Sequence, residues 1–177
     1  MIGEKLNKAM NDQIKNELES YYIYLSMAAY FHSASLDGMG HWMRCQAHEE
    51  MIHAMKFFNH VIDRGGKVVL QDLKQLKTDW SSPREAFKDA YEHEKFITAK
   101  INDLTTIARE QKDYSSEPLL AWFSDEQIEE EVSSGKIADQ LDMIGEDKSG
   151  LLMLDRELAA RAFSPGSPLE PLPPAGG

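Results

Sequence analysis

The amino-acid sequence predicts an all-α fold: a four-helix bundle with one long crossover between helices two and three, and a short fifth helix near the C-terminus. Three observations lead to this prediction. Glycine and proline divide the chain into four long segments and one short one. Within the long segments, apolar residues recur at alternating steps of three and four, the period of a helix that faces a bundle core. The connection that precedes the third segment is much longer than the others.

The breaks between the segments are rich in glycine, serine and proline. They lie at residues 37–40, 65–66, 81–83 and 115–118 and at Gly145. The third segment has the clearest beginning, because Ser82-Pro83-Arg84-Glu85 combines a capping serine, a proline at the first helical position and a glutamate at the third. We therefore expect a helix to begin at Pro83.

Each long segment carries an apolar stripe that is interrupted by polar side chains about halfway along. Glu50 and His53 lie one turn apart and therefore project to the same side of their helix. Because the stripes face one core, we predict that their polar members meet inside it. The stripes are Met10, Ile14, Glu17, Tyr21, Tyr24, Ala28 and Phe31; Met43, Gln46, Glu50, His53 and Phe57; Phe87, Ala90, Glu94, Ile97, Ile101, Leu104 and Ala108; and Leu120, Phe123, Gln127, Glu130, Ser134, Ile137, Leu141 and Ile144.

The length of the connection between Gly66 and Ser81 predicts how the helices are threaded. A helix of about 24 residues is about 36 Å long, and extended chain covers about 3.3 Å per residue. This segment can therefore run back along a whole helix, which makes the second and third helices parallel. The other connections are short and join antiparallel neighbours.

The C-terminal part of the chain divides into a helix and a tail. Residues 147–163 are expected to form the fifth helix, whose leucines have no place in a four-helix core, so we expect them to contact another subunit. Residues 164–177 contain five of the seven prolines and are expected to be a non-helical tail. The sequence thus predicts one domain over residues 1–163 and a proline- and glycine-rich tail over 164–177.

Composition excludes several classes of protein. The formal net charge is −11 and there is no basic cluster, which argues against nucleic acid as a partner. No apolar run approaches the roughly 18 residues that span a membrane, and the N-terminus does not resemble a secretory signal. A single cysteine, Cys45, excludes an intramolecular disulfide framework and a four-cysteine metal site. We expect a cytoplasmic protein in which Cys45 is a small buried hydrophobe.

The predicted polar cluster has the composition of a metal site. Four glutamates in a low-dielectric core must be neutralised by protons or cations, because burying an unpaired charge costs several kcal/mol. Two divalent ions would supply the charge, and carboxylates with one imidazole suit iron or manganese. A single glutamate on a predicted stripe is usually a surface residue that has been assigned to the wrong face of its helix. Here that error would have to occur in all four helices. The ligand-type residues are Glu17, Glu50, His53, Glu94, Gln127 and Glu130.

These residues resemble the ferritin family, specifically non-haem ferritins of the bacterial and archaeal type, over residues 1–163. Related di-iron bundles carry two Glu-x-x-His motifs, whereas this chain has one, at Glu50 and His53, and Gln127-x-x-Glu130 in the fourth helix. With fewer imidazole ligands the second metal position should hold iron more weakly, which lets iron move on into storage. The residues that carry the resemblance are Glu17 with Tyr24, Glu49-Glu50-Met51-Ile52-His53, Glu94, and Gln127-Ile128-Glu129-Glu130.

The resemblance implies an iron-storage protein with ferroxidase activity, which oxidises Fe(II) with dioxygen and stores Fe(III) as an oxyhydroxide mineral inside a cage of 24 subunits. It places the first iron at Glu17, Glu50 and His53. It places the second at Glu50, Glu94 and Glu130, with Gln127 nearby. It implies a third iron position at Glu49, Glu126 and Glu129, although an acidic solvated helix face would look the same. Tyr24 would lie beside the pair as an electron donor, or as a core phenol that is hydrogen-bonded to a carboxylate.

Three alternatives remain open from the sequence. A peroxide-reducing protein of the rubrerythrin type would normally add a four-cysteine domain, which this chain lacks. A haem protein of the bacterioferritin type would use a methionine such as Met51 or Met55, but methionines in helical chains are more often packing residues. A purely structural subunit that templates mineral should lack the ligand set. The histidines outside the stripes are expected at the surface or beside the ligands: His32, His41, His48, His60 and His93.

Overall fold

The computed structural model describes residues 1–74 and 77–163, and all regular structure within them is helical. The all-α prediction is therefore confirmed, whereas the expected tail at 164–177 lies outside the described residues. The elements are α1 (Glu4–Ser33), α2 (Asp37–Asp63), α3 (Pro83–Glu110), the 3₁₀ helix η1 (Tyr114–Ser116), α4 (Glu117–Ile144) and α5 (Lys148–Leu158).

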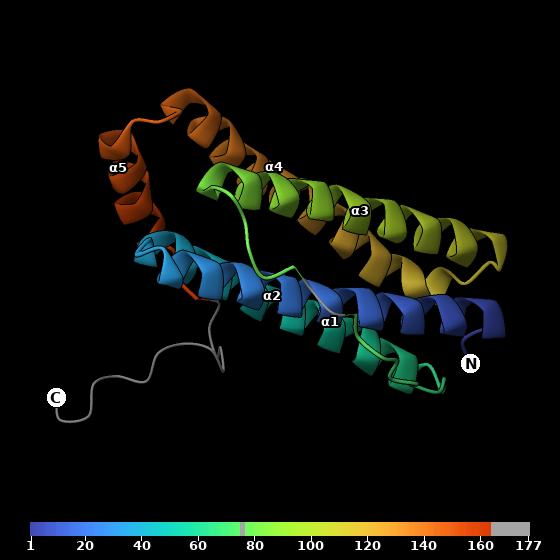
Figure 1. Ribbon diagram of the computed structural model, residues 1–177. Coiled ribbons are helices and arrows are strands. Elements are labelled where there is room, and N and C mark those ends of the chain that lie inside the picture. The colour runs from blue at the N-terminus through green and yellow to red at the C-terminus, as the bar shows by residue number, and fades with distance from the viewer. Residues whose placement is uncertain (75–76, 164–177) are drawn as a thin grey trace, which may run out of the picture.

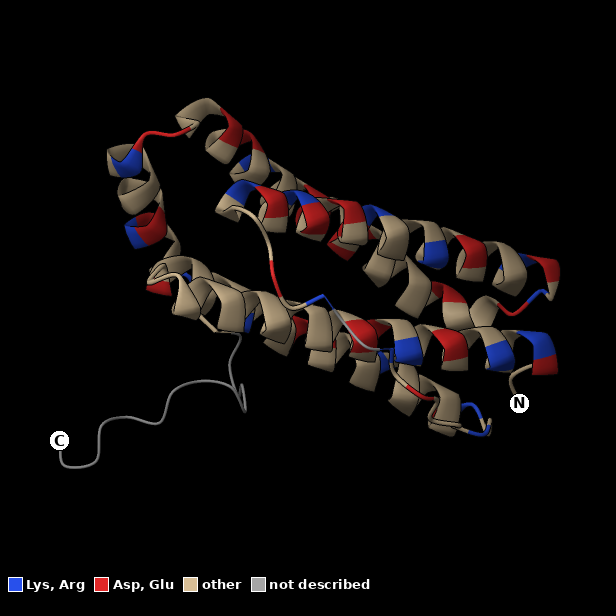
Figure 2. Ribbon diagram, viewed as in Figure 1, with Lys and Arg blue, Asp and Glu red and all other residues tan. Residues whose placement is uncertain are grey.

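The four long helices form two antiparallel pairs, α1 with α2 and α3 with α4 (Figure 1). The connection from α2 to α3 runs back along the bundle, so these two helices are parallel, as its length predicts. Helix α5 lies across the end of the bundle where α4 ends and α2 begins. Figure 2 shows acidic and basic residues interspersed along α1 and α3. Among the described residues, no helix has a stretch that is long and apolar enough to cross a membrane.

Local capping explains where two helices begin. The Ser82 hydroxyl accepts a hydrogen bond from the backbone N–H of Glu85 at 3.2 Å, and α3 begins at Pro83 as predicted. The carboxylate of Asp147 accepts from the backbone N–H groups of Ser149 and Gly150, at 3.0 and 3.2 Å, and so caps α5. Side-chain acceptors thus satisfy backbone donors that have no partner within the helix.

Two expected boundaries are wrong. Residues 37–40 lie inside α2 and do not separate the helices; a Cβ on Gly38 would lie 1.7 Å from the carbonyl oxygen of Asp155, so glycine here permits α5 to approach. The fifth helix ends at Leu158 and does not reach residue 163. Beyond Leu158 the chain instead packs against α2, where the carbonyl oxygen of Arg161 accepts a hydrogen bond from His41 Nε2 at 2.7 Å.

The apolar core consists of two clusters, one on each side of the polar residues in the middle of the bundle. One cluster includes Phe31, Met43 and Phe87, and the other includes Met10 and Phe57. The first cluster also contains Leu154 and Leu158 of α5, so the expectation that the leucines of the fifth helix contact another subunit is wrong for these two. Every residue of the four predicted stripes is buried except Tyr21 and Ile144, which are half-buried. The two clusters therefore enclose the polar centre between them and remove it from solvent.

Candidate metal centre

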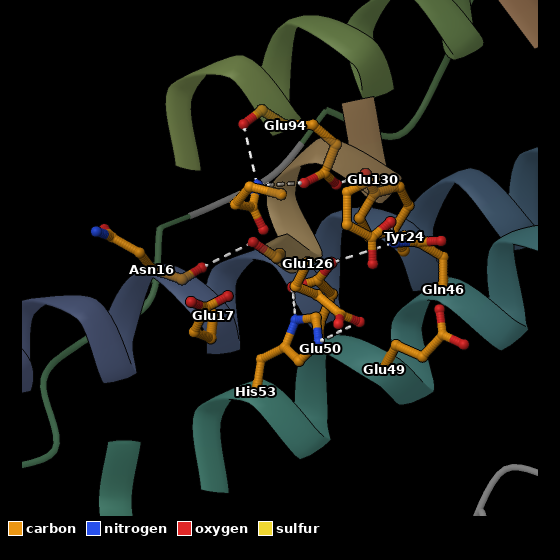
Figure 3. A network of polar contacts seen from close by, with 12 residues as sticks. Asn16, Glu17, Tyr24, Gln46, Glu49, Glu50, His53, Glu94, Glu126 and Glu130 are labelled. Carbon is orange, nitrogen blue, oxygen red and sulfur yellow. Dashed lines mark hydrogen bonds and ion pairs between the residues drawn. The ribbon is translucent and has the colours of Figure 1, made fainter. Parts of the chain in front are cut away.

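All four long helices contribute polar side chains to the middle of the bundle (Figure 3). Six predicted ligand residues meet there, and none of them is more than 5% exposed. Burial at this depth requires hydrogen bonds, protons or cations as compensation. They are Glu17 from α1, Glu50 and His53 from α2, Glu94 from α3, and Gln127 and Glu130 from α4.

Glu17, Glu50 and His53 form the first group of converging ligands. Each offers one ligand atom, and these atoms all lie within 4.8 Å of one another. Glu50 Oε2 lies 3.4 Å from His53 Nδ1. The amide of Gln13 donates to Glu17 Oε1 at 2.8 Å, whereas Glu17 Oε2 is buried without a hydrogen-bond partner in the described part of the chain. Such an orphaned carboxylate oxygen fits a cation ligand, because leaving it unpaired is costly.

A second group consists of His53, Glu126 and Glu130, whose ligand atoms also lie within 4.8 Å of one another. His53 Nε2 lies 3.6 Å from Glu126 Oε1, so the two ring nitrogens face carboxylates on different helices. Glu126 is only partly buried and lies at the edge of the enclosed cluster. It therefore joins the centre through His53, a contact that the spacing of residues in the sequence does not indicate.

Glu94 is held by two hydrogen-bond donors. Tyr24 donates its phenolic proton to Glu94 Oε1, and the Gln127 amide donates to Glu94 Oε2 at 3.2 Å and to the Glu94 carbonyl at 3.3 Å. These contacts fix the carboxylate in place on the side of the centre nearest Tyr24. The core-phenol alternative for Tyr24 matches this geometry, and the hydrogen bond also couples its proton to Glu94.

The buried carboxylates have strongly raised pKa values. Burial, followed by the charge of a neighbouring carboxylate, raises the pKa of Glu17, Glu94 and Glu130 to about 8 and also raises that of Glu50. Burial lowers the pKa of His53, but its contacts with Glu126 and Glu50 outweigh this effect and raise it well above the usual range. Protons thus compensate the cluster when no cation does so, and cations compete with them.

A family model for the ferritin-like domain matches residues 7–144. The chain belongs to the ferritin family. Curated relatives include a bacterial non-heme ferritin from Staphylococcus epidermidis, which is 37% identical over 164 residues that cover 93% of this chain and 99% of the relative. Another is a bacterial non-heme ferritin from Staphylococcus aureus, which is 37% identical over 163 residues that cover 92% of this chain and 98% of the relative.

Solved ferritin structures share this fold. A humanized archaeal ferritin superposes with a TM-score of 0.92 at 47% identity, covering 93% of this chain and all of the other. An open-pore ferritin from the hyperthermophilic archaeon Archaeoglobus fulgidus superposes with a TM-score of 0.90 at 46% identity, covering 92% of this chain and all of the other. The described helices thus have the arrangement of known ferritin subunits.

Three further residues support the centre of this ferritin. Gln13 precedes Glu17 by four residues, a spacing that places the pair on one helix face and could have revealed Gln13. Gln46, four residues before Glu50, already lies on a predicted stripe. Gln46 donates to Glu130 Oε2 and, at 3.4 Å, to Glu50 Oε1. Arg161, beyond α5, contacts Gln46 in turn. No sequence signal identifies that contact, because 115 positions separate the two residues.

The three glutamates predicted for a third position lie in different surroundings. Glu49 pairs with Arg161, Glu126 approaches His53, and Glu129 is exposed. Among the described residues, they do not form one group of converging ligand atoms. The third position in this ferritin therefore stays a prediction.

The remaining histidines and the cysteine are outside the two groups. His93 is held by a 2.7 Å contact with the Ser20 hydroxyl, and burial lowers its pKa to about 4. His48 is buried rather than exposed, and the ring of Phe163 lies nearby. Cys45 is buried as expected, and burial raises the pKa of its thiol to about 11, which keeps it protonated and unreactive.

Proposed function

We propose that this chain is an iron-storage ferritin with ferroxidase activity. It oxidises Fe(II) with dioxygen at a pair of positions inside each subunit and stores Fe(III) as an oxyhydroxide mineral within an oligomeric cage. The observation that carries the proposal is the buried convergence of Glu17, Glu50 and His53, which includes a carboxylate oxygen without a hydrogen-bond partner among the described residues. Oxygen ligands with one imidazole suit Fe(II).

Fe(II) is the substrate of this centre. We assign the first position to Glu17, Glu50 and His53, and the second to Glu50, Glu94 and Glu130, with Gln127 beside it. Glu50 converges with Glu17 and His53, and the Gln46 amide joins it to Glu130. It is therefore the candidate bridge between ions about 3.5–4 Å apart. The second position lacks an imidazole of its own, which favours transit of iron rather than permanent retention.

The electron balance of the reaction gives Tyr24 a further role. Two Fe(II) ions supply two electrons, which with two protons reduce dioxygen to hydrogen peroxide; hydrolysis of the Fe(III) products then releases protons. Reducing that peroxide to water takes two further electrons and two protons. Tyr24, which donates a hydrogen bond to Glu94, is placed to supply one of these electrons while its proton passes to that carboxylate, and a third Fe(II) ion would supply the other. Glu49, Glu126 and Glu129 remain the proposed third iron position.

We further propose that the subunits assemble into a 24-subunit shell in the cytoplasm. Apolar side chains on α4 and α5 support assembly, because Val132, Met143 and Met153 are 63%, 80% and 71% exposed in the single subunit. Large exposed apolar side chains that lie near one another commonly mark a protein interface. The net charge of −11 per subunit would concentrate cations at such a shell.

Replacing Met153 by aspartate is expected to dissociate the assembly. Burying a methionine at an interface contributes about 1.5–3 kcal/mol, and a symmetric shell repeats this loss in every subunit. Size-exclusion chromatography with light scattering should show a smaller species, whereas Met153→Leu should leave the mass unchanged. If Met153→Asp keeps the wild-type mass, α5 does not form the subunit contact.

Anomalous diffraction at the iron edge tests the centre directly, on crystals soaked with Fe(II). We expect two peaks about 3.5–4 Å apart among Glu17, Glu50, His53, Glu94 and Glu130. An empty bundle centre at saturating iron would show that protons alone neutralise the carboxylates, and would contradict the proposed function.

A further inference from the structure

Arg161 lies against the face of α2 that leads into the metal centre. Its guanidinium donates to Gln46 Oε1 at 2.8 Å and to the carboxylate of Glu49. The guanidinium carbon lies 4.4 Å from the centre of the Trp42 ring, and the backbone carbonyl accepts from His41 Nε2 at 2.7 Å. These contacts to successive turns of α2 hold the chain beyond α5 in place and orient the guanidinium.

Gln46 transmits this contact to the centre. Its side chain is fully buried, and its amide nitrogen donates to Glu130 and, at 3.4 Å, to Glu50. A guanidinium can only donate hydrogen bonds, so Arg161 requires the amide oxygen of Gln46 to point toward it. The amide nitrogen then points inward, where both carboxylates need a donor. The reversed amide would place its oxygen against carboxylate oxygens.

Glu49 is the second partner of the guanidinium. The two side chains are each 21% exposed, so their attraction is less screened than that of a surface pair. The contact is a charge-assisted hydrogen bond, the stronger kind. A cation that binds at Glu49 must either displace Arg161 or sit beside a fixed positive charge, and both lower its affinity.

We propose that Arg161 is a positioning residue that controls how many cations the centre holds. It fixes the Gln46 amide toward Glu50 and Glu130, and it neutralises Glu49 so that this carboxylate binds a cation more weakly than the central positions do. The inference rests on the proposed function, because the control matters only where the centre takes up iron. Arg161 thereby competes with cations for Glu49, one of the residues of the proposed third iron position.

Anaerobic calorimetric titration of the assembled, full-length protein with Zn²⁺ tests this role. Arg161→Gln should tighten cation binding at Glu49 about tenfold or more, the effect of losing one charge-assisted hydrogen bond. The variant should therefore bind one additional cation per subunit with measurable affinity. Adding Glu49→Gln to this variant should abolish the additional site. Arg161→Lys, which retains the positive charge but not the two-pronged contact, should weaken cation binding at Glu49 again relative to Arg161→Gln, and Arg156→Gln on the exposed face of α5 serves as the control.

Equal numbers and affinities of sites in wild type and Arg161→Gln would overturn the inference, as would an additional site that survives Glu49→Gln. If Arg161→Gln does not fold, anomalous diffraction from wild-type crystals soaked with Zn²⁺ decides. Strong central peaks with Arg161 still on Glu49 are expected, and a third peak of equal occupancy at Glu49 would overturn the inference. A wild-type protein that neither binds cations centrally nor oxidises Fe(II) would instead contradict the proposed function.

Discussion

Replacing His53 by alanine is expected to lower the initial rate of Fe(II) oxidation about 100-fold or more, because losing a metal ligand costs at least as much as losing its hydrogen-bonding support. His53 belongs to both groups of converging ligand atoms, so its removal affects both at once. Replacing Glu50, the candidate bridge, should have a similar effect. The measurement is stopped-flow absorbance of Fe(III) formation after mixing with Fe(II) in air-saturated buffer.

His32→Ala and Glu92→Gln are matched controls for these variants. Both residues are exposed and lie outside the centre; His32 contacts Asp37, and Glu92 pairs with Lys95. Their oxidation rates should match wild type. If His53→Ala and Glu50→Ala assemble normally and also oxidise Fe(II) at the wild-type rate, the chain acts as a structural subunit that templates mineral without a ferroxidase centre.

The protein stripped of divalent cations is expected to lose stability as the pH rises from about 5 to about 8. Glu17, Glu94 and Glu130 have pKa values of about 8 in the folded state, against an ordinary value of 4.5. In this window the folded state retains protons that the unfolded state has released, so its advantage declines as the pH rises. Each such group contributes up to about 1.4 kcal/mol per pH unit. His53, with its raised pKa, acts in the same direction.

Scanning calorimetry of chelated protein at pH 5, 6.5 and 8 measures this dependence. Below this range another effect begins, because Arg64 lowers the pKa of Asp113, and protonating that carboxylate removes their pairing. Adding Zn²⁺ should raise the melting temperature more at pH 8 than at pH 5, since the cation replaces protons that are absent at high pH.

Glu17→Gln is the variant that isolates one group in this experiment. It removes one titrating carboxylate, so stability should fall less steeply with pH, whereas the exposed control Glu92→Gln should retain the wild-type slope. A wild-type stability that is flat from pH 5 to 8, or equal slopes in all three proteins, would show that the buried carboxylates do not hold protons as their surroundings indicate.

The sequence predicted the helices and their buried faces because both depend on local chemistry. The stripe residues Glu17, Glu94 and Glu130 are buried at the depth that their 3–4 spacing indicates, since helical periodicity fixes which side chains share a face. Ser82 caps α3 because its partner, the backbone N–H of Glu85, is only three residues away. The length of the crossover likewise limited how the four helices could be connected.

Other features depended on how distant elements pack. The sequence assigned residues 37–40 to a break, because nothing local shows that Gly38 accommodates the backbone of Asp155. It did not pair His53 with Glu126, or predict that Arg161 orients Gln46. Periodicity gives the face on which a side chain lies, but the rotation and axial position of one helix against another, and the rotamers that follow, are decided by packing in three dimensions. The sequence alone therefore determined the helices and the residues that enter the core, and the tertiary structure decided which of those residues contact one another.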